Sequence, residues 1–173
     1  MRGLWKPRNA DEPVIFQAEF AEAYNGVMAT AMPLMTRMST MSNADHDVHL
    51  SEEPDYDHLL RSNLERVFNE RDAGKRAEAI ADLFVAEPVM YEPTNIVKGR
   101  TAISEVAGSL LEQFGPAFRF QPEGDAMGHH GVGVLRWKAG PADGPVAVTG
   151  SDVAEMVDGK IARLWVLLTP AER

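Results

Sequence analysis

The chain has 173 residues, of which 45% are hydrophobic and 25% charged, and its formal net charge is −9. This length fits one domain with an extension, and the hydrophobic share is sufficient for a packed core. The acidic balance argues against a nucleic-acid partner, because phosphate binding needs a clustered positive surface. No apolar run approaches the roughly 20 residues that span a bilayer, and the start lacks the apolar stretch of a secretory signal. We therefore expect a soluble, cytoplasmic protein without a membrane partner.

Residues 1–54 differ in character from the rest and are expected to form an N-terminal arm and linker. Six of the nine methionines lie in this segment. Asp11 and Pro13 are suited to the start of a helix, and apolar residues follow at helical spacing as far as Pro33. Two interpretations stay open. The segment is either a short amphipathic arm that needs a surface to lie on, or a mobile tail or upstream extension.

Three helices are expected at the start of the second part, residues 55–173, because apolar residues recur there every three or four positions. The first spans about 56–72 and ends at Gly74, and a short second helix follows it. The third begins at Thr101, its expected N-cap, and ends at Gly115. The residues expected to face the core are Leu60, Leu64, Val67 and Phe68 in the first helix, Ala77, Ile80, Ala81 and Phe84 in the second, and Ile103, Val106, Ala107, Leu110, Leu111 and Phe114 in the third.

Strands are expected between and after these helices. A short β-prone run, Val89-Met90-Tyr91, precedes the third helix. Alternating residues after it predict strands at 118–120, 127–138, 146–157 and 161–168, with a loop at 139–145. Asp158-Gly159 is the strongest two-residue hairpin signal in the chain. Helices followed by hairpin strands indicate an α+β fold, with the helices on one face of a curved, mainly antiparallel sheet.

Three stretches of residues 55–170 occur in a recognisable order. They are Asp82-Leu83-Phe84 leading into Tyr91-Glu92-Pro93, then Lys98 to Ile103, then Gly150 to Ile161. In this order they resemble the NTF2-like superfamily, and within it the SnoaL-like and ketosteroid isomerase-like proteins. The resemblance implies a cone-shaped fold with a deep apolar pocket, and usually a homodimer formed through the sheet. It implies binding of a small apolar molecule, polyketide-like or steroid-like, with weak isomerase-type proton transfer. The alternative is a non-catalytic ligand-binding or dimeric interaction module.

Two acids are the candidate catalytic residues. Glu92 lies in a position resembling the general-base carboxylate of the isomerases, which also precedes a proline after a short strand. An apolar pocket raises the pKa of a carboxyl towards neutral pH, as proton transfer requires. Asp152, six residues before Asp158, resembles the second acid of these isomerases, which is kept protonated as a hydrogen-bond donor. The alternative is structural: Glu92 lies in solvent at a strand exit, and Asp152 bonds a neighbouring side chain or backbone N–H.

The resemblance is incomplete at two positions. The isomerases carry a tyrosine on the first helix as an oxyanion donor, whereas this chain reads Ser62-Asn63-Leu64. The polyketide cyclases carry an acid on the last strand, where Val166 stands here, and a histidine where Asp152 stands. The isomerase set is therefore only partly present, and the cyclase set is absent.

Further residues are expected to line the pocket. Some share the strand face of Asp152, since alternate residues of a strand point the same way; others lie on neighbouring strands. His129 and His130 are adjacent on an expected strand and should point to opposite faces, so they should not chelate one ion together. We expect neither a metal site nor a cofactor, because no motif for either is present. The expected ligand-binding residues are Tyr91, His130, Val148, Ala154, Met156 and Val166.

Overall fold

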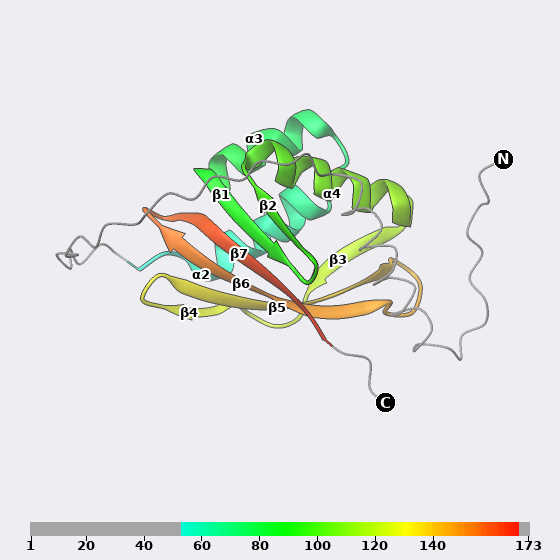
Figure 1. The fold of residues 1–173 in the computed structure, drawn as a ribbon. Coiled ribbons are helices and arrows are strands. Elements are labelled where there is room, and N and C mark those ends of the chain that lie inside the picture. Colours follow the sequence, from blue (N-terminus) through cyan, green and yellow to red (C-terminus); the bar gives the residue numbers. More distant parts are fainter. Residues whose placement is uncertain (1–52, 170–173) are drawn as a thin grey trace.

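The computed structural model describes residues 53–169, in which three helical segments cover one face of a curved seven-stranded sheet (Figure 1). This confirms the expected α+β architecture. The segment 1–54, expected to be an arm and linker, lies almost entirely outside the described residues, so its two interpretations stay predictions. Within residues 53–169, no helix combines the length and apolar character needed to cross a membrane.

The first helical segment consists of α2 (Tyr56–Asn63) and a π-helical continuation, η1 (Leu64–Phe68). It begins where the sequence predicts, because the Asp55 carboxylate accepts a hydrogen bond from the backbone N–H of His58 at 2.9 Å. It ends at Phe68 rather than residue 72. The physical reason lies in Asn69, whose amide both donates to and accepts from the backbone of Phe120, at 2.8 Å each way. These two hydrogen bonds fix Asn69 against the strand that contains Phe120, so the helix does not continue.

The second helix, α3 (Ala73–Leu83), corrects two expectations. Asp72 is its N-cap, with a carboxylate oxygen 2.9 Å from the backbone nitrogen of Lys75. Gly74 therefore lies inside the new helix and does not end the previous one. The buried side also differs from the expected one: Ala77 and Ala81 are exposed, and Phe84 begins the next strand. The residues that α3 buries are Arg76, Ala79, Ile80 and Leu83.

A charged residue on the buried side explains this misassigned face. Arg76 is 6% exposed. Its guanidinium donates to the backbone oxygens of Glu70 at 2.7 Å and Ser104 at 3.0 Å. A hydrophobicity pattern assigns charged residues to solvent, because burying an unpaired charge is costly. These backbone partners compensate that cost only in the folded chain.

The third helix, α4 (Arg100–Phe114), carries the expected buried stripe, with Phe114 only partly buried. Its N-cap is Gly99 rather than Thr101, and Gly115 ends it as expected.

Most strands extend beyond the expected ranges, but the strand expected at 146–157 begins only at Val148. Two hairpins are unexpected. The expected short strand at residues 89–91 becomes a full strand, Phe84–Glu92, which pairs with an unexpected strand, Asn95–Lys98. The expected strand 127–138 is broken by a turn at His130-Gly131, where φ is 52° and 77°. The Asp158-Gly159 hairpin is confirmed. The strands are β1 (Phe84–Glu92), β2 (Asn95–Lys98), β3 (Phe118–Pro122), β4 (Met127–His129), β5 (Val132–Pro141), β6 (Val148–Val157) and β7 (Lys160–Leu168).

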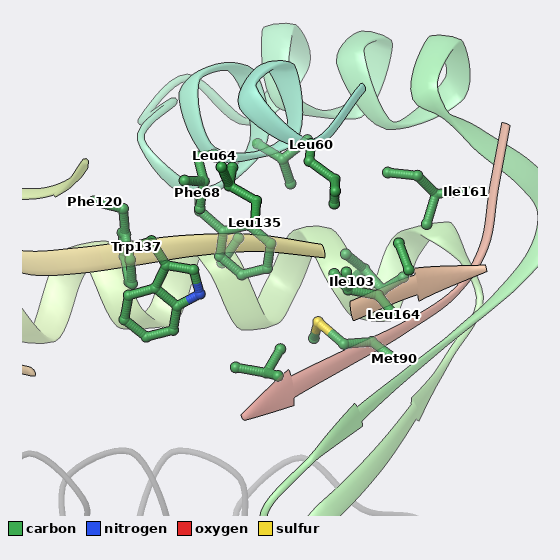
Figure 2. Close-up of a cluster of buried hydrophobic side chains, with 14 of the residues drawn as sticks. Leu60, Leu64, Phe68, Met90, Ile103, Phe120, Leu135, Trp137, Ile161 and Leu164 are labelled. Atoms are coloured by element: carbon green, nitrogen blue, oxygen red, sulfur yellow. The ribbon is translucent and has the colours of Figure 1, made fainter. Parts of the chain in front are cut away.

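The sheet has the strand order β2-β1-β7-β6-β5-β3, with β4 paired to β5. Strands β1 and β7 are parallel, and the other pairs are antiparallel. The parallel pairing places the first long strand beside the last one. Residues far apart in the sequence therefore meet on the inner face, which packs on the helices. Figure 2 shows this core, in which side chains from the first helix lie over Leu135 and Trp137 of β5.

Candidate functional site

A small pocket opens between the helices and the inner face of the sheet. Its volume is about 10 Å³, room for about one water molecule, so the surrounding side chains largely fill it. Its wall is apolar except for one acid. The lining residues are Leu64, Phe68, Leu110, Phe120, Trp137, Asp152 and Val166.

Asp152 is buried because it occupies an inward position of β6. Alternate residues of this strand are buried, and Asp152 is only 3% exposed. Burial raises the pKa of its carboxyl from 3.8 to about 7, although the hydrogen bond from Trp137 opposes the rise. The Trp137 indole Nε1–H donates to Oδ1 of Asp152 at 2.8 Å. Asp152 therefore faces the pocket, as the functional interpretation of the sequence expects. It also bonds a neighbouring side chain, as the structural alternative expects.

Glu92 lies on the same inner face, at the end of β1, and is 7% exposed. On parallel strands β1 and β7, Met90 pairs with Leu164, so the same register places Glu92 level with Val166. On the other side of β7, Val166 pairs with Asp152. Glu92 and Asp152 thus flank Val166, with their backbones about 10 Å apart because two strand spacings separate them. Glu92 itself is not among the residues lining this pocket.

The expected ligand-binding residues fall into three groups. Val166 lines the pocket with Asp152. Val148, Ala154 and Met156 are buried in the core on the same side of β6, outside the wall of this pocket. The other two lie elsewhere. Tyr91 is on the outer face of the sheet, stacked on Trp165 with ring centroids 5.1 Å apart, and His130 is exposed at the β4–β5 turn.

The two adjacent histidines do not point to opposite faces as expected. Their Nδ1 atoms are 3.0 Å apart, because His130 leaves the strand with a φ of 52°. This expectation was wrong because it assumed one continuous strand through both residues. In the part of the chain that the structure describes, no group of three His, Asp or Glu side chains is placed to hold a metal ion.

Sequence reasoning missed two polar features of the site region. The sequence shows that Trp137 is an aromatic residue on a strand, but nothing in it reveals that its indole reaches Asp152. Asn63 is fully buried, and neither atom of its amide has a hydrogen-bond partner among residues 53–169. In the sequence, a polar residue directly before Leu64 is the one signal that could have indicated this buried amide. The structure places it where α2 becomes η1.

Three helical segments on one face of a curved, mainly antiparallel sheet are the architecture of the NTF2-like superfamily. Within it, a family model described as a SnoaL-like domain matches residues 63–164, more than half of the chain. The protein belongs to this SnoaL-like family. Its sequence matches none of the curated proteins with which it was compared.

Solved structures share this fold. A SnoaL-like protein from Agrobacterium tumefaciens, described as a candidate isomerase, has a TM-score of 0.61 at 21% identity and covers 66% of this chain and 97% of its own. A candidate ketosteroid isomerase from Kribbella flavida has a TM-score of 0.52 at 16% identity, covering 68% and 80%. An NTF2-like protein of unknown function from Exiguobacterium has a TM-score of 0.53 at 19% identity, covering 65% and 99%. At these identities the likeness shows the fold alone.

Proposed function

We propose that the domain binds a small apolar molecule, polyketide-like or steroid-like, and anchors one hydrogen-bond acceptor of it on Asp152. The observation that carries this proposal is the burial of Asp152 in an otherwise apolar pocket, with a pKa of about 7. The apolar wall favours an apolar ligand body, and its single acid supplies orientation. Because the pocket holds only about 10 Å³, the ligand would enter by displacing the side chains that now fill it. Near neutral pH a substantial fraction of this carboxyl is protonated, so it can donate a hydrogen bond to a carbonyl oxygen.

We further propose weak isomerase-type proton transfer on such a ligand. In the proposed step the Glu92 carboxylate removes a proton from the carbon next to the carbonyl, and protonated Asp152 donates to the oxygen on which negative charge develops. Glu92 then returns the proton to another carbon of the enolate. A ligand lying across Val166 would have one acid on each side, which supports this pairing. The reaction needs no group beyond these two side chains.

The rate of this reaction should be low. Removing one oxyanion donor typically costs about 100- to 1,000-fold in rate. The first helix carries Ser62-Asn63-Leu64 where the isomerases carry a tyrosine, so Asp152 would act without that second donor.

A second candidate function is non-catalytic binding. It is favoured by the position of Glu92, which is buried on the inner face but outside the lining of the pocket. In this case Asp152 anchors the ligand and no proton is exchanged with carbon.

We also propose that two copies associate through the outer face of the sheet. Tyr91 and Trp165 stack there, on neighbouring strands. Ile96 and Leu167 are 56% and 51% exposed. Large apolar side chains gathered on one face are typical of an interface between subunits.

The test of catalysis compares Glu92→Gln and Asp152→Leu with the wild type. NMR would follow deuterium uptake from D₂O by a series of enolisable cyclic ketones, and calorimetry would give their affinities. The proposal predicts that Glu92→Gln binds a ketone normally but loses exchange, whereas Asp152→Leu, which has no hydrogen-bond donor, weakens both. Binding without exchange in the wild type would leave the non-catalytic function. If the wild type binds no member of the series and native mass spectrometry of protein from its own host finds no retained small molecule, both functions fail.

A further inference from the structure

We infer that Trp137 binds one oxygen of the Asp152 carboxyl and leaves only Oδ2 for a ligand, so the pocket selects ligands with a single hydrogen-bond acceptor. Trp137 and Gly150 are positioning residues, because Gly150 leaves the space that lets the indole reach the carboxyl. The part of this inference that concerns ligands rests on the proposed function. The part that concerns the carboxyl stands on the geometry of β5 and β6.

The first observation is the close approach of the Trp137 ring to Gly150. These residues are direct partners in the antiparallel β5–β6 pair. A Cβ atom at Gly150 would lie 2.5 Å from Cζ2 and 2.8 Å from Cη2 of the indole. It would also lie 2.6 Å from the backbone oxygen of Leu167. Any residue other than glycine would therefore displace the ring. The role of Gly150 is to leave space for it.

The second observation is where this space lets the indole reach. Asp152 lies two residues beyond Gly150 on the same face of β6, and the indole nitrogen is 2.8 Å from its Oδ1. On its other side the Trp137 ring meets Phe120 edge to face, with centroids 5.5 Å apart and planes at 73°. Phe120 and Trp137 lie together at one end of the core in Figure 2. The Trp137 ring thus packs between β6 at Gly150 and the ring of Phe120.

The indole N–H of Trp137 is a hydrogen-bond donor only. Oδ1 therefore accepts from Trp137 in either protonation state of the acid. A proton on Oδ1 would face the indole N–H, so the proton of the neutral acid belongs on Oδ2. Among the residues that the structure describes, Trp137 supplies the one hydrogen bond to this carboxyl. Oδ2 is the oxygen left for a ligand.

The consequence is a rule for ligand chemistry. Protonated Asp152 offers one O–H donor, which suits a carbonyl oxygen. It does not offer the two oxygens that a guanidinium or amidine would bind side by side. We therefore expect a ketone to bind better than an amidine of the same carbon skeleton.

The orientation is tested first without any ligand, by NMR of protein labelled with ¹⁵N in its tryptophans. The indole N–H signal of Trp137 should shift with pH, with a midpoint near 7, and this titration should vanish in Asp152→Asn. The matched control is Trp165 on the outer face, whose signal should show no such dependence on Asp152. Gly150→Ala should weaken or abolish the titration by moving the ring. A Trp137 signal without this titration, or one that titrates equally in Asp152→Asn, would overturn the inference.

Selectivity is tested next with a ketone and an amidine of one skeleton. Loss of one hydrogen bond that orients the acid should lower the ketone affinity of Trp137→Phe by about tenfold. Trp165→Phe should stay within about twofold of the wild type. Trp137→Phe keeps an aromatic ring in the core, so it provides the test if Gly150→Ala fails to fold. Unchanged ketone preference in a folded Trp137→Phe variant would refute the selectivity. A pH-dependent indole signal in a protein that binds neither compound would refute the ligand-binding function and leave the orientation intact.

Discussion

Asp152 and Val166 stand opposite each other on β6 and β7, and both line the same small pocket. The acid is therefore bordered by an apolar side chain whose size sets the space beside it. Glu92 lies level with the same valine on the far side of β7. Val166 is thus the residue across which the two acids would cooperate, and its size should affect ligand binding without changing the chemistry of either acid.

Filling this space should weaken ligand binding. In Val166→Phe the larger ring would occupy the pocket, and we expect affinity for a small ketone to fall at least about tenfold, while overpacking costs roughly 1–3 kcal/mol of stability. The matched control is Val153→Phe, on the outward side of β6, which should leave affinity unchanged. Calorimetric titration of both variants, with thermal melts to confirm folding, provides the measurement. Wild-type affinity in a folded Val166→Phe variant would place the ligand elsewhere.

The stability of the protein should fall between pH 5 and pH 8 because of Asp152. Its pKa is raised from 3.8 to about 7 on folding, so the folded state holds a proton that the unfolded state has released. The stabilising contribution is complete below pH 3.8 and is lost as pH rises through about 7. Linkage gives a loss of roughly 2–3 kcal/mol between about pH 5 and 8.

Urea denaturation of the wild type and Asp152→Asn across this range measures the effect, because asparagine does not titrate. The difference in unfolding free energy between the two proteins should change with pH by that amount, in favour of the wild type at low pH. A difference that is constant with pH would show that the carboxyl of Asp152 titrates alike in the folded and unfolded chains.

Two asparagines of the first helical region should respond oppositely to leucine. Leucine has the same branching as asparagine and removes the polar atoms. Asn63→Leu should stabilise the protein by about 1–2 kcal/mol, because the buried Asn63 amide has no partner among the described residues. Asn69→Leu should destabilise it by about 1–3 kcal/mol, because it breaks both bonds to the backbone of Phe120. Thermal and urea unfolding would compare them. A destabilising Asn63→Leu would instead indicate that a bound water or ligand pairs with this amide.

Replacing Trp165 should separate the proposed dimer. An arginine at this position would put a charge on the apolar outer face and remove the stacking with Tyr91. We expect the dissociation constant of the dimer to rise at least about tenfold. Met127→Arg is the control, since Met127 is 71% exposed on β4, away from the centre of this face. Sedimentation velocity over a concentration series would report both. A wild type that is monomeric at all concentrations would refute the association.

The sequence predicts those elements whose apolar residues face one direction. The buried stripe of α4 and the Asp158-Gly159 hairpin follow from local spacing and turn chemistry. The prediction fails for α3, where Arg76 takes an inward position that apolar residues usually occupy. It also fails at His130, where a left-handed backbone breaks an expected strand. At Arg76 the deciding hydrogen bonds go to backbone oxygens outside α3. At His130 the backbone conformation of the turn decides.

By itself, the sequence determined that one α+β domain would form, with helices on a sheet and Asp152 among inward residues of its strand. These features depend on periodicity, and periodicity is local. Only the tertiary structure decided that Trp137 reaches Asp152 over Gly150, that Glu92 and Asp152 share Val166 as a neighbour, and that Tyr91 faces outward. The physical reason is that strand register and strand order bring these residues together. The pKa of a buried acid in turn depends on which side chains surround it.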